Sequence, residues 1–542
     1  MRSYDPRPSH PASGGRVEHG LPPLPRGVLA IDGPAALPWE RLLAALPGTS
    51  AVDVRESHLP WAEIVRRTGG AAADPVFQRV WDGDLADLYG ELARVDGDAI
   101  VFGPGAALVP HGELWYADTP KRHALAAVRR GEAPNVGQRA GARGTEPRLL
   151  FVDWPVVDRH KQRLLPHIDH YVDFGNPDAP LRLSGDALRH TLAQLARRPF
   201  RTLPTFLPGP WGGQWIRREL GIETDAPNLA WSYELIAPEA SVLVDGLEVG
   251  FELLLAGESE TILGPEPAAR FGRSFPIRFD YLDTLEGGDL SIQCHPSAAY
   301  MHETFGLPYT QDETYYVMRT TPGAKVFLGL RPDADVDAFE RDAGAALDGR
   351  AFDPARFLQV QDAEQHQLYL IPAGTPHASG AGNVVLEISA TPYLYTLRFY
   401  DWLRRDLEGT LRPVHLEHAF ANLDPLRRGE AVTRELVQRP TPVRAGTGWA
   451  ELELGRLNEL FFAVHRLDFE DAVEDDTAGR FHMLSLVEGG EVAVEPATGG
   501  ATTLAYAETI LVPASVGPYR LRRRNGPPAR VVKAFVKPIG HR

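Results

Sequence analysis

The pattern of apolar residues changes character near residue 198, and this change limits the folds that the chain can adopt. Before this point, short apolar runs alternate with stretches of helical periodicity. Strands that alternate with helices indicate crossover connections and a parallel sheet, so an α/β domain is expected. The expected strands are 28–33, 99–105, 114–118 and 149–154, and the expected helices are 38–47, 75–94 and 184–196.

The rest of the chain is expected to be mainly β. After residue 198, Gly/Pro turns and short alternating strands continue to about residue 400, a pattern typical of closed or double-sheet antiparallel folds. A charged, helical stretch follows, and then short strands return. The prediction is a multidomain α/β plus all-β chain: an N-terminal parallel-sheet domain (28–198), a first β domain (199–400), a helical connector (401–447) and a second β domain (448–542).

Residues 1–27 are expected to form a flexible leader. Six prolines lie between Pro6 and Pro25, and the segment contains few apolar side chains. Such a composition cannot bury enough apolar surface to offset the entropy lost on ordering.

Composition excludes several classes of protein. The single cysteine, Cys294, rules out an intrachain disulfide or a cysteine-based metal cluster and fits a reducing cytoplasm. The net charge of −16 disfavours nucleic acids and anionic membranes. There is no apolar signal segment and no run of about 18 apolar residues. We therefore expect a soluble cytoplasmic protein with neither a nucleic-acid nor a membrane partner, and leave a homo-oligomer open.

Side chains capable of chemistry are densest in three segments: DLSIQCHP (289–296), QDETYYVM (311–318) and LIPAGTPHASGAGN (370–383). Because side chains alternate faces along a strand, Gln293 and His295 point the same way while Cys294 points to the other side. Glu313 begins the next expected strand. His377 follows a Pro-x-Gly turn that would reverse the chain.

Two imidazoles, a carboxylate and an amide oxygen form a donor set that suits Zn²⁺, with Fe²⁺, Mn²⁺ or Co²⁺ as competitors. One ion per chain is expected, and an open coordination position would make it catalytic. A single strand histidine is more often an ordinary hydrogen-bonded side chain, so the hypothesis depends on the ordered set. Cys294 is expected to be a buried small hydrophobe rather than a nucleophile.

These motifs resemble the type I mannose-6-phosphate isomerases, which are zinc enzymes of the cupin superfamily. The resemblance rests on LSIQCHP, on the glutamate of the YY-containing strand and on IPAGTPHA, and covers roughly residues 200–400. Further matches are PTFLPGPWGGQWI (204–216) and FPIRFDYLD (275–283). The resemblance implies two cupin-type β-barrels and a metal held by Gln293, His295, Glu313 and His377.

The chain departs from the family pattern where the substrate is expected. Gln311 and Asp280 stand where the family usually has lysines. The resemblance implies that Glu387 is the acid/base residue or a partner of a metal-bound histidine. It makes Arg398 a phosphate clamp or an enediolate stabiliser, unless Arg398 pairs with Asp401. Other cations that could replace the lysines are Lys325, Arg273 and Arg278.

The N-terminal region is expected to lack kinase catalysis, and the C-terminal region is expected to lack a metal. VLAIDGPAALPW (28–39) and LWYADTPKRHALAAVRRG (114–131) resemble uridine-kinase-like enzymes, but the phosphate-binding Gly-x-x-x-x-Gly-Lys-Ser/Thr loop is absent. The resemblance therefore implies a domain that has lost catalysis and serves structure, regulation or assembly. Asp32 and Asp118 either bind a ligand or cap turns.

In the last region, Gly517 and Pro518 occupy the zone where a metal-binding histidine would be needed, and His482 is expected to have no companion ligand.

The resemblance implies a metal-dependent aldose–ketose isomerase acting on a phosphosugar. The favoured reaction converts mannose 6-phosphate to fructose 6-phosphate by proton transfer through an enediol. The alternative is a non-catalytic carbohydrate-sensing or regulatory cupin protein, which Gln311 and Asp280 favour. An Fe²⁺ oxygenase fits less well, because a glutamine ligand departs from the pattern of two histidines and one carboxylate.

Overall fold

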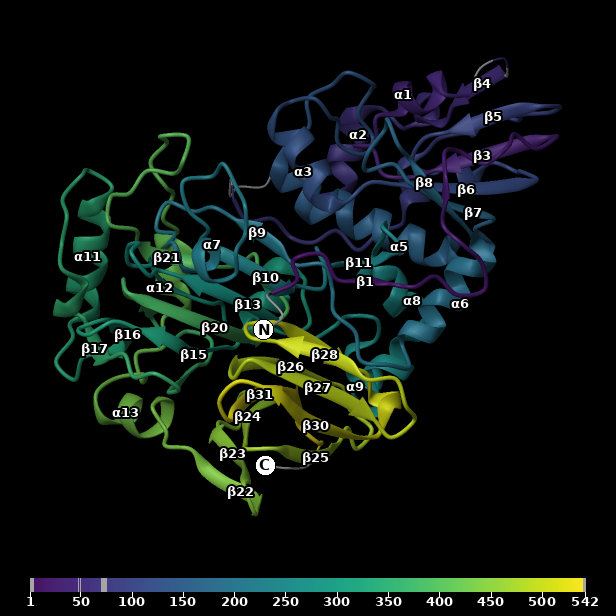
Figure 1. The fold of residues 1–542 in the computed structure, drawn as a ribbon. Coiled ribbons are helices and arrows are strands. Elements are labelled where there is room, and N and C mark those ends of the chain that lie inside the picture. The colour runs from purple at the N-terminus through teal and green to yellow at the C-terminus, as the bar shows by residue number, and fades with distance from the viewer. Residues whose placement is uncertain (1–3, 47, 49, 70–75, 540–542) are drawn as a thin grey trace.

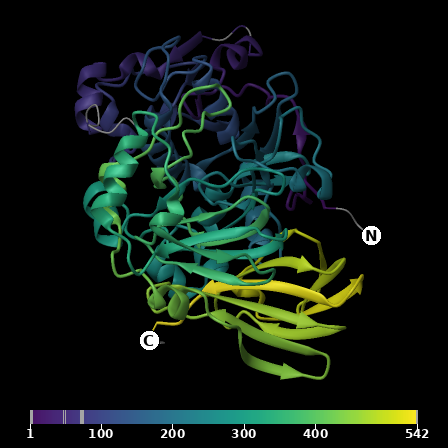
Figure 2. The same cartoon turned by 90° about the vertical axis from the view of Figure 1, so that its left-hand side faces the viewer.

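The computed structural model describes residues 4–46, 48, 50–69 and 76–539. Along the chain it forms an N-terminal sheet flanked by helices, a central pair of antiparallel sheets and a C-terminal pair of sheets (Figure 1). Figure 2 shows these regions one above the other, with the N-terminal region at the top. The expected combination of α/β and β-rich parts is confirmed. The expected domain limits stay predictions.

The N-terminal sheet is mixed, with the order β2-β8-β7-β6-β3-β5-β4. The strands β4, β5, β3, β6 and β7 run parallel, while β8 and β2 add antiparallel pairs at one edge. Its strands are β2 (Glu18–His19), β3 (Val28–Asp32), β4 (Ser50–Asp53), β5 (Ala99–Phe102), β6 (Glu113–Asp118), β7 (His170–Asp173) and β8 (Leu181–Ser184). The helices of this region are α1 (Trp39–Ala44), α2 (Trp61–Arg67), α3 (Lys121–Arg129), α4 (Glu146–Arg148), α5 (Trp154–Leu164) and α6 (Gly185–Leu195).

Two secondary-structure predictions for this region are wrong. The expected strand 149–154 is a π-helical segment, Leu149–Asp153, that continues into α5. Periodicity alone cannot separate a short buried strand from a buried helix. The expected helix 75–94 contains a single 3₁₀ turn, Leu85–Leu88, among its described residues, and residue 75 lies outside them. Distant carbonyls of Phe305 and Phe151 instead accept the backbone N–H groups of Val80 and Trp81.

The structure also differs from the expected flexible leader. Over residues 4–27, β1 (Ser9–His10) pairs with β11 (Ser241–Val244), and β2 pairs with β8. The buried Tyr4 donates its hydroxyl to Glu234 Oε1 at 2.6 Å. Backbone pairing and one buried tyrosine hold a segment whose low apolar content suggested disorder. Residues 1–3 of the expected leader lie outside the described residues.

The central region consists of two antiparallel sheets, of order β18-β15-β20-β13-β10-β9 and β17-β16-β19-β14-β21. The first contains β9 (Thr205–Leu207), β10 (Trp231–Leu235), β13 (Ile277–Asp283), β15 (Glu313–Thr320), β18 (Leu368–Ile371) and β20 (Asn383–Ala390). The second contains β14 (Ile292–Cys294), β16 (Lys325–Leu330), β17 (Leu358–Asp362), β19 (His377–Ser379) and β21 (Leu397–Tyr400). Each residue of β13 and of β20 is buried, as expected for strands at the centre of a closed β fold.

The central part of the chain also forms six α-helices among its described residues. They are α7 (Trp215–Glu219), α8 (Phe251–Leu263), α9 (Pro265–Phe271), α10 (Ala298–Tyr300), α11 (Val336–Ala346) and α12 (Leu416–Asn422). Helix α12 packs against β14 and β21, on the side that the sulfur of Cys294 faces, 3.7 Å from the carbonyl of Ala419. Helix α8 packs against α5 and α6, so it joins the central and N-terminal regions. It is preceded by β12 (Leu247–Gly250), the partner of β11.

The C-terminal region has two further sheets, of order β22-β23-β24-β31-β26-β29 and β25-β30-β27-β28. The strands are β22 (Thr441–Gly446), β23 (Trp449–Gly455), β24 (Phe462–Phe469), β25 (Ala472–Asp476), β26 (His482–Glu488), β27 (Glu491–Pro496), β28 (Thr502–Ala505), β29 (Thr509–Val512), β30 (Pro518–Asn525) and β31 (Ala529–Val536). The expected helical connector 401–447 holds α12 and α13 (Glu430–Leu436), but it ends in β22, which belongs to this region. The segment TPVRAG of β22 is an exposed edge strand of that sheet rather than part of a helix.

Within the described residues, none of the helices combines the length and apolar character needed to cross a bilayer. The cytoplasmic location stays a prediction.

We expect Tyr4→Ala to destabilise the protein. The substitution removes a buried ring and leaves the buried Glu234 without one donor. Loss of a buried aromatic side chain typically costs about 3 kcal/mol. Thermal melting of the full chain measures the effect, and Arg7→Ala at an exposed position serves as the control. Equal melting temperatures for Tyr4→Ala and Arg7→Ala would show that the N-terminal segment is not anchored.

Candidate metal centre

Two antiparallel strands bring the first candidate ligands together. Gln293 of β14 lies directly opposite His377 of β19, although 84 positions separate them along the chain. His295 follows immediately after β14. Gly374, in the turn before β19, has φ +79°, and a side chain there would meet the carbonyl of Asn422. This left-handed position favours glycine and lets the Pro-x-Gly turn present His377 to the interior.

Glu313 reaches the same point from the facing sheet, as the first residue of β15. Its Oε2 contacts His295 Nε2 and lies 3.3 Å from His377 Nε2. The ligand atoms of His295, Glu313 and His377 all lie within 4.8 Å of one another. No other group of three His, Cys, Asp or Glu side chains is this close in the part of the chain that the structure describes.

The trio is fully buried, with exposures of 1%, 1% and 0% for His295, Glu313 and His377. Burial alone would raise the pKa of Glu313, but the two imidazoles outweigh it and hold the pKa well below its usual range. Burial lowers the pKa of His295 despite the neighbouring carboxylate. These directions favour an ionised Glu313 and a neutral His295, the forms that bind a cation.

The donor set fits a metal ion. Glu313 Oε1 is buried without a hydrogen-bond partner, which is unusual unless an ion or water satisfies it. His377 Nδ1 lies 2.9 Å from the carbonyl of Thr375, which leaves Nε2 facing the carboxylate. Gln293 presents its Nε2 atom to His377 Nε2 at 3.4 Å. A ligand role for Gln293 therefore requires its amide to rotate so that the oxygen points inward.

A cavity of about 120 Å³ opens beside the trio and is lined by Gln293 and Glu313. Residues of both central sheets contribute to its wall. The wall also contains the residues that the family resemblance singled out near the substrate, namely Arg278, Asp280, Gln311, Glu387 and Arg398. The cations Lys325 and Arg273 are not part of this wall; Lys325 instead pairs with Asp362.

Glu387 and Arg278 form a buried ion pair in the cavity wall. Arg278 binds Glu387 Oε1 and donates from Nε to Ser389 Oγ at 2.6 Å, and Ser389 in turn donates to Glu387 Oε1 at 2.8 Å. Glu387 Oε2 makes no hydrogen bond with another described residue. Burial raises the pKa of Glu387, while Arg278 opposes that shift.

The two positions that depart from the family pattern both face Arg278. Asp280 Oδ1 lies 3.7 Å from Arg278 Nε and has no hydrogen bond. With its amide turned to satisfy both atoms, Gln311 accepts from Arg278 Nη2 at 2.9 Å. Burial raises the pKa of Asp280 to about 7. In this chain the buried positive charge is therefore on Arg278.

Arg398 does not pair with Asp401, which was the alternative to a substrate role. Asp401 binds Arg412 at 2.6 Å, while Arg398 Nη1 donates to the carbonyl of Pro413 at 3.1 Å. Arg398 makes no ion pair within the described chain. Burial, together with the nearby Arg412, lowers the pKa of Arg398 to about 10.

Sequence reasoning missed several residues of the cavity wall, chiefly Trp231, Tyr233, Tyr393 and Arg412. None of them carries a motif, and only the folded sheets bring them to the wall. Tyr393 also donates its hydroxyl to Glu239, a residue outside this wall.

His482 is hydrogen-bonded within the C-terminal region. His482 Nδ1 lies 2.8 Å from the hydroxyl of Tyr519, which donates to Asp475 at 2.9 Å. Lys533 binds Asp475 at 2.7 Å and Glu451 at 2.8 Å. Lysine and tyrosine thus satisfy these side chains, and the absence of a metal from this region stays a prediction.

The N-terminal aspartates have partners as well. Asp32 accepts the backbone N–H of Ala107 and lies 2.9 Å from His160 Nε2. Asp118 accepts from Lys161 at 2.8 Å and from Tyr171 at 2.9 Å. Asp32 thus holds a turn together, and Asp118 pairs with a buried lysine.

Over part of its length the chain is similar to several mannose-6-phosphate isomerases. The mannose-6-phosphate isomerase of Streptococcus mutans serotype c is 25% identical over 292 residues, which are 52% of this chain and 83% of that protein. Mannose-6-phosphate isomerase ManA of Bacillus subtilis is 26% identical over 230 residues, 42% of this chain and 68% of its own length. The chain is homologous to mannose-6-phosphate isomerases over part of its length.

A solved structure extends the likeness to the fold. The crystal structure of the mannose 6-phosphate isomerase from Bacillus subtilis matches with a TM-score of 0.51 and 19% identity, covering 62% of this chain and 99% of that one. Residues 16–197 match a family described as a domain of unknown function (DUF8485). The uridine-kinase-like interpretation of this region stays a prediction.

We expect the purified protein to bind about one Zn²⁺ per chain, measured by elemental analysis after dialysis and by calorimetric titration. Removal of a direct ligand by Glu313→Ala or His377→Ala should weaken binding more than about 100-fold, since outer-shell changes alone cost about 10- to 100-fold. His111→Gln, at an exposed histidine, is the control. Unchanged zinc affinity in both ligand variants would contradict the assignment.

Proposed function

We propose that the protein is a metal-dependent aldose–ketose isomerase that acts on a phosphosugar, with conversion of mannose 6-phosphate to fructose 6-phosphate as its reaction. The observation that carries this proposal is the buried His295–Glu313–His377 trio at the wall of a cavity that also holds a carboxylate and arginines. Homology to mannose-6-phosphate isomerases supports the same reaction class.

His295, Glu313 and His377, with Gln293 after rotation of its amide, would hold the ion. A bound Zn²⁺ supplies Lewis acidity, which stabilises negative charge that develops on the substrate oxygens. Fe²⁺, Mn²⁺ and Co²⁺ have overlapping ligand preferences and are the competitors to test.

Glu387 is the proposed proton-transfer residue. Isomerisation moves a proton between adjacent carbons through an enediol, which requires a group that can both accept and return it. Arg278 and Ser389 fix Glu387 through Oε1, so Oε2 remains to meet the substrate. Burial raises the pKa of this carboxyl and makes it a stronger base once ionised.

Arg398 is the proposed phosphate-binding residue. It lines the cavity and makes no ion pair within the described chain, so its charge is available to an anionic substrate. Arginine forms charge-assisted, frequently bidentate hydrogen bonds with phosphate. Arg412 also lines the cavity, but Asp401 already neutralises it.

The alternative function is a non-catalytic protein that senses a carbohydrate. Its support is the pair of substitutions at Asp280 and Gln311, which remove two cations that the family resemblance implies. Arg398 weakens that support, because it keeps in the same wall an arginine without an ion pair to any described residue, whereas Arg278 is already paired with Glu387. Binding of mannose 6-phosphate to the zinc-loaded protein without turnover would favour the sensing function.

We expect Glu387→Gln to lower kcat for mannose 6-phosphate by about 10²- to 10⁴-fold, the usual contribution of a general acid/base. KM should change little, because the amide keeps the size of the side chain and a hydrogen bond to Ser389. A coupled assay of fructose 6-phosphate formation measures the rate. Glu408→Gln, at an exposed glutamate, is the control. A Glu387→Gln variant as active as the Glu408→Gln variant would remove Glu387 from the mechanism.

We expect Arg398→Met to raise KM for mannose 6-phosphate about 10-fold or more, since a charge-assisted hydrogen bond contributes about 1.5–3 kcal/mol. Methionine preserves much of the side-chain volume while removing the charge. The affinity for unphosphorylated mannose, measured by competition, should stay the same. A parallel loss of affinity for both sugars would point to a structural role instead.

A further inference from the structure

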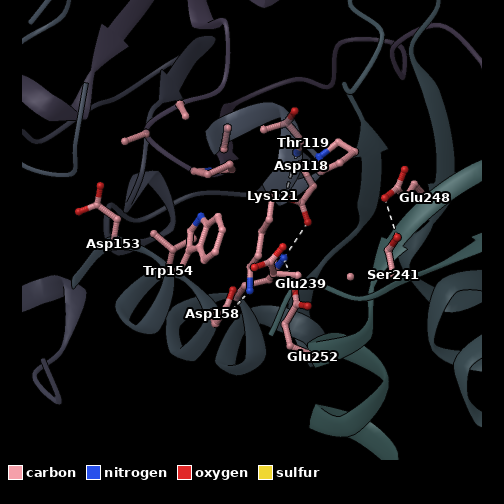
Figure 3. Close-up of a pocket in the computed structure, with 18 of the residues that line it drawn as sticks. Asp118, Thr119, Lys121, Asp153, Trp154, Asp158, Glu239, Ser241, Glu248 and Glu252 are labelled. Carbon is pink, nitrogen blue, oxygen red and sulfur yellow. Dashed lines mark hydrogen bonds and ion pairs between the residues drawn. The ribbon is translucent and has the colours of Figure 1, made fainter. Parts of the chain in front are cut away.

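A second cavity, of about 50 Å³, lies at the carboxyl ends of the parallel strands of the N-terminal sheet (Figure 3). The loop after β3 contributes Pro34–Ala36, and the loop after β6 contributes Asp118–Lys121. The chain runs from β3 to β4 and β5 on one side and then to β6 and β7 on the other. Ligand sites of open α/β sheets form at such a reversal of strand order.

The wall of this cavity carries more acidic than basic side chains. Its acidic side chains are Asp118, Asp153, Asp158, Asp173, Glu239, Glu248 and Glu252, whereas its cations are Lys121 and Lys161. Lys161 pairs with Asp118 and Glu252, and Lys121 pairs with Asp158 at 2.5 Å. Arg122 reaches Glu248 from outside the wall. The remaining carboxyl groups have no cationic partner in the wall.

Asp153 has an unsatisfied acceptor. Its side chain is buried, with an exposure of 2%. Oδ2 accepts from Asn135 Nδ2 at 2.8 Å and from the backbone N–H of Val136 at 3.1 Å, while Oδ1 has no hydrogen-bond partner. Burial raises the pKa of Asp153 to about 7. A buried acceptor without a partner on a cavity wall calls for a donor from a bound molecule.

An apolar wall adjoins these acceptors. It consists of Trp154 together with Ala35, Val136, Leu149 and Val157. Figure 3 shows Trp154 between Asp153 and the group formed by Lys121, Asp158 and Glu239. A ligand for this site therefore needs a hydrogen-bond donor at one end and an apolar body.

The charge excludes two common ligand classes. A phosphate or nucleotide would face net negative charge, and the phosphate-binding Gly-Lys-Ser/Thr loop is absent from the sequence. A bare divalent cation needs several converging oxygens. Among the described residues, the acidic side chains of this wall do not bring three ligand atoms within 4.8 Å of one another.

We propose that this cavity binds a small organic ammonium ion, whose N–H groups donate to Asp153 Oδ1 and whose alkyl body packs against Trp154. The positive charge is favoured by the surplus of carboxylates, and the apolar body displaces water from the alanine and valine side chains. The site is separate from the metal centre, and its occupancy does not depend on the proposed isomerase reaction.

The test is calorimetric titration of the full-length protein in 150 mM NaCl, with n-butylammonium chloride as the probe. We expect saturable binding of one ion per chain. The neutral analogue n-butanol tests the need for charge, and inorganic phosphate and MgCl₂ test the excluded classes. Absence of saturable n-butylammonium binding, or equal binding of n-butanol, phosphate or Mg²⁺, would overturn the proposal.

Two variants locate the binding. Asp153→Asn keeps the shape and the contacts of Oδ2 but removes the charge, and should weaken binding at least 10-fold. Ala36→Leu adds bulk to the cavity wall while leaving every carboxyl group in place, and should abolish binding. The control Asp186→Asn removes an exposed carboxylate outside the cavity and should bind as the unmodified protein does. If Asp153→Asn fails to fold, Ala36→Leu decides; unchanged affinity in a folded Ala36→Leu variant contradicts the site.

Discussion

The candidate metal centre depends on one pairing, that of β14 with β19. It sets Gln293 opposite His377 and holds His295 where the strand ends, so that Glu313 can meet them from the facing sheet. A carboxylate without compensation in such a buried position would cost several kcal/mol. Two imidazoles offset part of that cost, and one carboxylate oxygen is still unsatisfied. The surrounding sheets thus hold together a set of side chains that a cation would stabilise further.

A second buried cluster of charged side chains surrounds Arg278, in the wall of the cavity beside the trio. Its guanidinium is buried and contacts Glu387, Ser389 and Asp280. Because a buried arginine keeps its charge, it opposes the rise in pKa that burial imposes on Glu387 and Asp280. Arg278 and Asp280 lie on β13, and Glu387 lies opposite Asp280 on β20. The pairing of these two strands therefore fixes Glu387 beside Arg278.

The sequence was most informative where local spacing determines geometry. The alternation of Gln293 and His295 and the Pro-x-Gly turn before His377 predicted which side chains share a face, and the structure brings the His295–Glu313–His377 trio together. Apolar runs predicted β3, β5 and β6 correctly. The run at 149–154 failed because strand and buried helix share the same short pattern. Tyr393, Arg412 and the companions of His482 reach their sites only through long-range packing, which leaves no signature in the local sequence.

The hydrogen bond from Tyr393 to Glu239 joins two cavities that lie on different sheets. Tyr393 belongs to the wall beside the metal centre, and Glu239 belongs to the acidic wall of the N-terminal region. The hydroxyl of Tyr393, on one wall, thus donates its hydrogen bond to a carboxylate of the other wall. A change in the position of Glu239 would remove the acceptor of the Tyr393 hydroxyl. The contact ties the α/β region to the central β region at the level of single side chains.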